Sequence, residues 1–342
     1  MAAAAARLPA FSRGQVAVLA ALAAVPLVDL VVPIQLAAPM RNVIVFAILA
    51  LGLNVVVGWT GLLNLGIAAF MAIGAYAFGI LTCEIYPFQV GFWWGVVLAG
   101  AIGAGAGWLL GAPTLRLRGD YLAIVTLGFG EIVQDALKNL EVVTKGTQGI
   151  NPLPAPALPG VAMGSDRVVP WFYLYLAILG AVVFLARNLE LSRLGRQWFA
   201  VREDELAARC MAIEPDRAKL KAFAAGAALA AVSGALYASL LSSTGEPSNY
   251  DFQISILALC IVIVGGIGSI TGILVGAIVV VGLSNVVLPI LTQALQRAGI
   301  GSTDNVLSSP DNYKYLIFGL ALVLMMRYRP DGIVHSRKAV RK

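Results

Sequence analysis

The sequence has 342 residues, of which 59% are apolar by type and only 12% are charged, and its mean hydropathy is +0.86. A soluble globular protein is about 45–50% apolar and about 25% charged, so this chain has too few charged side chains to cover a water-exposed surface. The composition, with a formal net charge of +6, disfavours a disordered protein, a nucleic-acid-binding module and a disulfide scaffold, and it favours lipid as the solvent.

Ten stretches of the chain are predicted to be membrane helices. A bilayer core about 30 Å thick needs roughly 20 apolar helical residues, and backbone groups in lipid must pair within a helix. In chain order the stretches are 15–33, 42–57, 62–82, 90–112, 121–137, 170–186, 220–242, 252–266, 270–290 and 313–327. The fifth is the weakest, because polar and glycine residues interrupt its apolar run. The sequence therefore predicts an all-α, polytopic bundle of about ten transmembrane helices, forming one domain over residues 1–342.

Basic residues predict the orientation of these spans. With the N-terminus in the cytoplasm, 18 of the 24 Lys and Arg residues fall on the cytoplasmic side. This bias follows the positive-inside rule and predicts that both termini are inside. Loop 187–219 and the basic tail 328–342 are then cytoplasmic, and loop 138–169 is external. Residues 1–28 also resemble a secretory signal, whose removal would leave the other spans oriented the same way; we favour a retained span, because the apolar run extends to Pro33.

Motifs for catalysis are absent from the sequence. It contains no G-x-x-x-x-G-K-[ST] phosphate loop and no zinc-protease helix pair, and its only histidine is His335. The three cysteines, Cys83, Cys210 and Cys260, have no metal-ligand spacing. We therefore expect no enzyme activity and no metal or cofactor bound by this chain, which leaves a transporter, a channel or a scaffold.

The longest polar interruption on the predicted cytoplasmic side runs from Arg187 to Lys221. Residues 200–213 in it are good helix formers without proline, and Pro215 is expected to end the helix. Leu206 lies on an apolar face of this helix, and Arg202 and Glu205 lie on a charged face. Such a short amphipathic helix is either an interfacial linker or a docking helix for a cytoplasmic partner.

The run Ala200–Ile213 resembles the coupling loop of bacterial ABC importer permeases. More narrowly, it is similar to the branched-chain amino acid ABC transporter permease family, of the LivM type, which reads R-E-x-E-x-A-A-x-x-x-G-I. The residues that match are Arg202, Glu203, Glu205, Ala207, Ala208 and Ile213, and Ala212 stands where the family has glycine. With Leu206, these residues form the predicted ATPase-coupling helix.

Further segments carry the same resemblance. Residues 51–54 with 58–66, residues 117–128 followed by 131–132, and residues 265–272 are similar to the family's signatures. Residues 144–150 are a looser match, with Lys145 where glycine is common. Together with the coupling helix they cover about residues 40–290 in the family's order.

The resemblance implies a transport subunit of the bacterial inner membrane. Its expected partners are a second homologous permease, two cytoplasmic ATP-binding subunits that use the ATP, and a periplasmic solute-binding protein; we expect contact with lipid and not with nucleic acid. Transport would follow alternating access. A urea or short-amide importer stays open as an alternative substrate class. An autonomous channel or ion-coupled carrier, and a non-transporting scaffold, are alternatives of other classes.

Four polar residues are candidates for the translocation path. Glu131 lies mid-span beside Gly128 and Gly130, where we expect the helix to break and to offer backbone groups to a ligand. It either lines the path or pairs with an Arg, Ser or Thr side chain of a neighbouring span. Asn54, Thr60 and Asn64 flank a glycine-rich turn. For these three, hydrogen bonding between helices is the stronger interpretation. The proline-containing external loop 138–169 is expected to help receive the binding protein.

Overall fold

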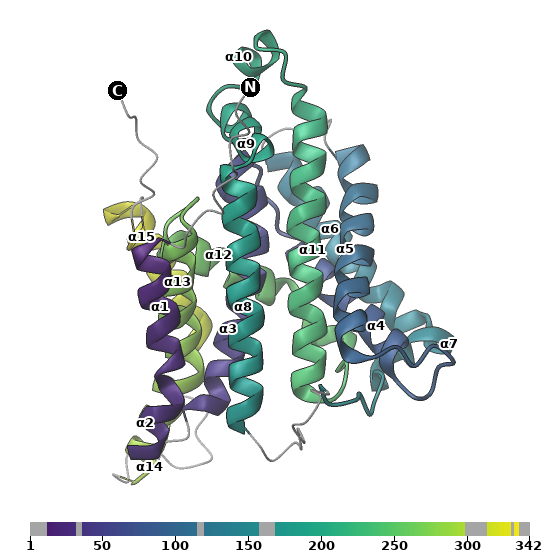
Figure 1. The fold of residues 1–342 in the computed structure, drawn as a ribbon, viewed down its shortest axis with the longest axis vertical. Coiled ribbons are helices and arrows are strands. Elements are labelled where there is room, and N and C mark those ends of the chain that lie inside the picture. Colours follow the sequence, from purple (N-terminus) through teal and green to yellow (C-terminus); the bar gives the residue numbers. More distant parts are fainter. Residues whose placement is uncertain are drawn as a thin grey trace, which may run out of the picture.

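The computed structural model describes residues 12–31, 36–114, 120–156, 168–297, 313–329 and 332–334. Within these ranges the chain is helical and contains no strand (Figure 1), which confirms the all-α prediction. Most of tail 328–342, part of loop 138–169 and residues 117–119 of the second signature lie outside the described residues.

Six helical runs in the described chain are long and apolar enough to cross a membrane. They are α3 (Ala37–Thr60), α5 (Phe92–Thr114), α8 (Val168–Leu191), α11 (Pro215–Leu241), the 3-10 turn η2 (Pro247–Tyr250) with α12 (Phe252–Gly265), and α13 (Ile270–Gly282) continued by the π-helical turn η3 (Leu283–Val287) into α14 (Leu288–Arg297). The other predicted spans correspond to α1 (Arg13–Ala23) with α2 (Val25–Val31), α4 (Ile67–Thr82), α6 (Asp120–Asn139) and α15 (Lys314–Tyr328), which are shorter or less apolar. The count of about ten therefore stays a prediction.

The first predicted span, 15–33, is divided into two helices. A turn at Ala24 separates α1 from α2, and Pro26 follows in the first turn of α2. Proline has no N–H to donate to the preceding turn, which explains the interruption. The Asp29 carboxylate accepts hydrogen bonds from the N–H groups of Leu36 (2.6 Å) and Ala37 (2.7 Å) and so caps the start of α3.

Small residues let α11 pack at the centre of the bundle, against α3, α4 and α5 (Figure 1). Gly226 of α11 meets Gly52 of α3, where a Cβ on either residue would lie 2.7 Å from the carbonyl oxygen of the other. Such spacing lets helix backbones approach closely, as expected for membrane helices.

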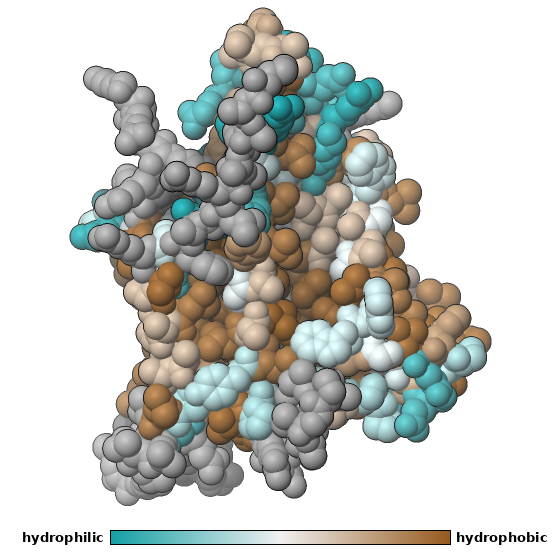
Figure 2. All heavy atoms as spheres, viewed as in Figure 1, coloured by the Kyte–Doolittle hydropathy of each residue, from teal (hydrophilic) through white to brown (hydrophobic). Residues whose placement is uncertain are grey.

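One face of the molecule has an apolar band between two polar ends. On the face drawn in Figure 2, apolar side chains form a continuous band, while hydrophilic ones gather over α9 (Arg193–Glu203) and α10 (Glu205–Cys210) at one end and near α7 (Glu141–Thr144) at the other. A membrane-embedded bundle has this distribution, because charged groups are costly in hydrocarbon.

Candidate functional site

The predicted single helix over residues 200–213 is wrong, because the structure has two helices there. Asp204 is extended (φ −157°, ψ 113°) and separates α9 from α10. Its carboxylate accepts hydrogen bonds from the N–H groups of Leu206 (2.8 Å) and Ala207 (3.0 Å). Aspartate at this position supplies the N-cap that satisfies the first N–H groups of α10, which makes a separate helix start possible here.

The turn after α10 ends the second helix well before Pro215. Ala212 has a left-handed backbone (φ 58°), the Ile213 N–H donates to the Ala208 carbonyl (3.1 Å) and the Ala212 N–H donates to the Arg209 carbonyl (3.1 Å). This is the Schellman pattern, for which glycine is the usual residue. The tight turn is therefore kept with alanine, at a cost in backbone strain. Pro215 begins α11 instead of ending α10.

Helix α9 is clamped onto the bundle by Trp198. Its side chain is buried and stacks on Trp59 of α3, with ring centroids 5.9 Å apart and planes 18° apart. The Trp198 indole N–H donates to the Ala218 carbonyl of α11 (2.8 Å), and the Trp59 indole N–H donates to the Gly268 carbonyl (3.4 Å) in the turn before α13. One pair of rings thus joins α9 to three neighbouring parts of the bundle.

Arg202 adds a second link between α9 and α3. Its guanidinium donates a hydrogen bond to the carbonyl oxygen of Gly58, in the last turn of α3. A cation is favourable at a helix C-terminus, where carbonyl groups lack partners within the helix.

Glu205 links α10 to α11 through a buried lysine. Its carboxylate accepts from the Lys219 ammonium (2.8 Å) and from the Arg209 guanidinium (3.0 Å), and the Lys219 side chain is only 7% exposed. Toward solvent, α10 presents apolar side chains: Leu206 is 75% exposed and Met211 is 77% exposed. The segment α9–α10 therefore joins an outward apolar surface to a charged and aromatic anchor, which is what a docking element needs. Glu203 and Ala207 are exposed beside this surface, and Ala208 is buried beneath it.

The structure disperses the four path candidates. The Asn54 amide oxygen accepts from the Gly268 N–H (2.8 Å), and the Asn64 amide oxygen accepts from the Gly66 N–H (2.9 Å). The Thr60 hydroxyl donates to the Val56 carbonyl within α3 (2.5 Å). All three are buried and bonded to the backbone, and none of them lines the cavity that Glu131 lines. Their role in a path stays a prediction.

The predicted helix break beside Glu131 is wrong, because α6 is continuous from Asp120 to Asn139. A glycine inside a helix costs only about 1 kcal/mol relative to alanine, so Gly128 and Gly130 do not interrupt it. The helix interruptions lie instead in the segments that face α6. There, α4 begins inside the bundle after a non-helical stretch from residue 61 to 66, and α12 begins at Phe252.

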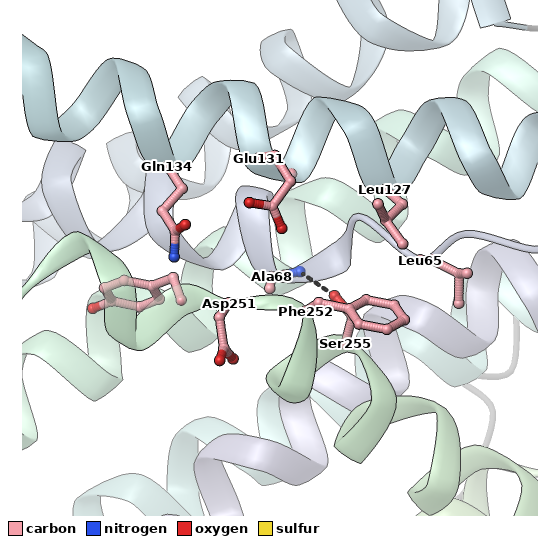
Figure 3. Close-up of a pocket in the computed structure, with 10 residues that line it drawn as sticks. Leu65, Ala68, Leu127, Glu131, Gln134, Asp251, Phe252 and Ser255 are labelled. Atoms are coloured by element: carbon pink, nitrogen blue, oxygen red, sulfur yellow. Dashed lines mark hydrogen bonds between the residues drawn. The ribbon is translucent and has the colours of Figure 1, made fainter.

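Glu131 points into a small cavity where these helix starts meet (Figure 3). The Ala68 N–H in the first turn of α4 donates to the Ser255 hydroxyl of α12 (3.2 Å), and Gln134 and Asp251 border the same space. The cavity has a volume of about 10 Å³, room for about one water molecule. Sequence reasoning missed Gln134, Asp251 and Ser255, although an aspartate directly before the apolar run 252–266 is a helix-start signal.

Comparisons of the sequence with known proteins point to one family. A family model described as "Branched-chain amino acid transport system / permease component" matches residues 35–326. The high-affinity branched-chain amino acid transport system permease proteins LivM of Salmonella typhimurium and Escherichia coli K12 are each 40% identical over 314 residues, covering 85% of this chain and 68% of the relative. The LivH protein of Escherichia coli K12 is 25% identical over 310 residues, covering 84% of this chain and 91% of the relative.

No solved structure is significantly similar to this chain. The family model alone spans most of the sequence, from α3 into α15. The chain therefore belongs to the family of permease components of branched-chain amino acid transport systems.

Proposed function

We propose that this chain is the membrane-spanning permease subunit of an ABC importer for branched-chain or related amino acids. It works by alternating access, driven by ATPase subunits on separate chains. The similarity to the LivM and LivH permease proteins of branched-chain amino acid transport systems supports the substrate class and a second, homologous permease as partner. Two ATP-binding subunits and a periplasmic solute-binding protein complete the proposed complex, and this chain itself binds no cofactor.

The observation that carries the proposal is the anchoring of α9–α10. Trp198 and Arg202 tie α9 to α3, and Glu205 ties α10 to Lys219 of α11. A partner that binds the apolar surface around Leu206 would therefore move α3 and α11 together with α10. Differences in the free energy of partner binding between two states of the bundle would then shift the equilibrium between them.

The proposed place of the complex is the bacterial inner membrane, with α9–α10 and both termini in the cytoplasm. About ten helical segments lie in the membrane: the six long runs, together with α1–α2, α4, α6 and α15. The seven Lys and Arg residues of loop 187–219 support this orientation.

The natural cysteines test the orientation. Cys210 on α10 is exposed, whereas Cys83 and Cys260 are buried. A membrane-impermeant maleimide should label Cys210 in inverted inner-membrane vesicles but not in spheroplasts, and Cys210→Ser should abolish the labelling. Labelling in spheroplasts alone would place α10 outside and would contradict the proposal.

Docking is tested by Leu206→Asp. We expect this charge in the exposed apolar surface to abolish co-purification of the ATP-binding subunits and ATP-dependent leucine uptake into proteoliposomes. Val142→Asp is the matched control, because Val142 is 90% exposed at the opposite end of the bundle and should leave co-purification unchanged. Leucine transport by the purified chain alone would instead indicate an autonomous carrier, and uptake of urea without leucine would correct the substrate.

A further inference from the structure

A second, much larger cavity lies on another side of α12. It has a volume of about 600 Å³ and is bounded by α3, α11, η2, α12 and the π-helical turn η3. This volume is in the usual range of small-molecule sites. Asp251 borders both this cavity and the 10 Å³ cavity of Glu131, so the two spaces lie on either side of the start of α12.

The wall of the large cavity combines apolar and polar side chains at membrane depth. Phe46, Leu257 and Val281 supply apolar surface, while η3 contributes Ser284 and Asn285. Ser284 lies 14 residues along from Ile270, about 21 Å at the helical rise, inside an apolar run that continues to Thr292. Lipid cannot satisfy such polar groups, so this lining suits water or a polar ligand better than lipid tails. Short π-helical turns are rare and occur often at functional sites.

The charge of the cavity comes from one residue. Among the described residues that line it, Asp251 is the only member of the Asp, Glu, Lys and Arg group. The Asp251 carboxylate accepts one hydrogen bond from the Gln253 N–H (2.9 Å) at the start of α12, and a carboxylate has about four acceptor positions. The Asn42 amide oxygen, also on this wall, is buried without a hydrogen-bond partner. A ligand with several N–H donors fits these acceptors.

We infer that the large cavity is a binding site for a zwitterionic amino acid, with Asp251 binding the α-ammonium group. Asn249 and Asn285 also line the cavity, and their amide N–H groups would donate to the carboxylate of the amino acid, while Phe46 and Leu257 would contact an apolar side chain. The inference rests on the proposed function and deepens it. Asp251 selects for a cationic ammonium, which neutral urea lacks.

Asp251→Asn is a clean test, because asparagine caps a helix about as well as aspartate. The substitution keeps the start of α12 and removes the charge. In proteoliposomes containing the complete transporter and saturating leucine-loaded binding protein, we expect leucine uptake to fall at least tenfold. The ATP hydrolysis stimulated by loaded binding protein should stay within twofold of the wild type, because docking and coupling are intact.

Asp135→Asn is the matched control: it also removes one negative charge, but from an exposed side chain on α6 that lines neither cavity. It should leave uptake and ATP hydrolysis unchanged. Unchanged uptake in Asp251→Asn, or a parallel fall of uptake and ATP hydrolysis, would overturn the inference, the second because it indicates a structural role. Failure of the wild-type complex to import leucine would overturn the proposed function, a result distinct from either.

Discussion

The two ends of α11 are held by different kinds of interaction. At its first turn, side chains from α9 and α10 reach it: Glu205 pairs with Lys219, and the Trp198 indole donates to the Ala218 carbonyl. Just past its last turn, the links are neutral hydrogen bonds, two of which join backbone to backbone. The Leu153 N–H donates to the Ser242 carbonyl (3.0 Å), and the Thr244 N–H donates to the Ile150 carbonyl (3.0 Å).

The second end is a compact clamp rather than a free loop. The Ile150 N–H donates to the Thr244 hydroxyl (2.8 Å), the Tyr76 hydroxyl donates to the Gly245 carbonyl (2.9 Å), and the Tyr250 hydroxyl donates to the Thr244 carbonyl (2.7 Å). Gly149 (φ 66°) packs against Gly245. A set of neutral hydrogen bonds, each with at least one backbone partner, fixes one geometry, whereas long charged side chains can hold a helix through a range of positions. We therefore expect the α9–α10 end to move during transport and the clamp to stay fixed.

This difference changes how the external loop should be tested. Loop 138–169 is predicted to help receive the binding protein, and its residues up to 156 are described. Deleting residues 152–160 would also remove the bond from Leu153 to Ser242 and the Pro152 carbonyl that accepts from the Cys83 thiol (3.3 Å). Substitution of the exposed Thr147 or Gln148 keeps the clamp and tests docking alone.

The largest effect on stability is expected at the α9–α10 end of α11, which we expect to move. Glu205→Ala leaves the Lys219 ammonium buried without its carboxylate, and we expect the free energy of unfolding in detergent to fall by about 3 kcal/mol. Denaturant titration measures this change. Glu214→Ala is the control, since its ion pair with Arg217 (2.7 Å) is exposed and should contribute at most about 0.5 kcal/mol. Equal losses in the two variants would contradict a buried, structural role for Lys219.

A smaller effect is expected at the fixed end. Thr244→Val removes the acceptor of the buried Ile150 N–H and should cost about 2 kcal/mol, because an unsatisfied buried donor keeps its desolvation penalty. Thermal unfolding reports the loss, and co-purification with the ATP-binding subunits should be normal at low temperature. Thr147→Val, at an exposed hydroxyl nearby, should change neither. If Thr244→Val weakened partner docking selectively, the two ends would not be separable.

The smallest effect concerns the turn after α10. Ala212→Gly relieves the left-handed strain of alanine (φ 58°), and we expect a gain of about 0.5–1 kcal/mol in stability. Thermal unfolding of the full chain measures it, with Ala207→Gly as the opposite control inside α10, where glycine should destabilise the protein. A loss of stability in Ala212→Gly would mean that the turn differs from the Schellman geometry.

Some features of the fold are predicted by residue type alone, and some helix starts carry a sequence signal that the prediction did not use. The all-α bundle and the apolar spans follow from composition and from runs of apolar residues. Asp204 and Asp251 are helix-start residues by type, and the N-cap preference of Asp204 is the signal that divides residues 200–213 into two helices. At Glu131, two glycines gave a false signal of a helix break, because packing and propensity tolerate glycine inside α6.

The sequence by itself determined that this protein is suited to a lipid environment, that it is helical and which family it belongs to. These properties depend on the order and type of residues along the chain. Tertiary structure alone decided which polar groups meet. Glu205 reaches Lys219 only because α10 folds back onto α11, and Asn42, Asp251 and Asn285 share one cavity only because α12 begins inside the bundle beside a π-helical turn. Contacts between residues far apart in sequence depend on how helices are broken and packed, and no local pattern encodes that.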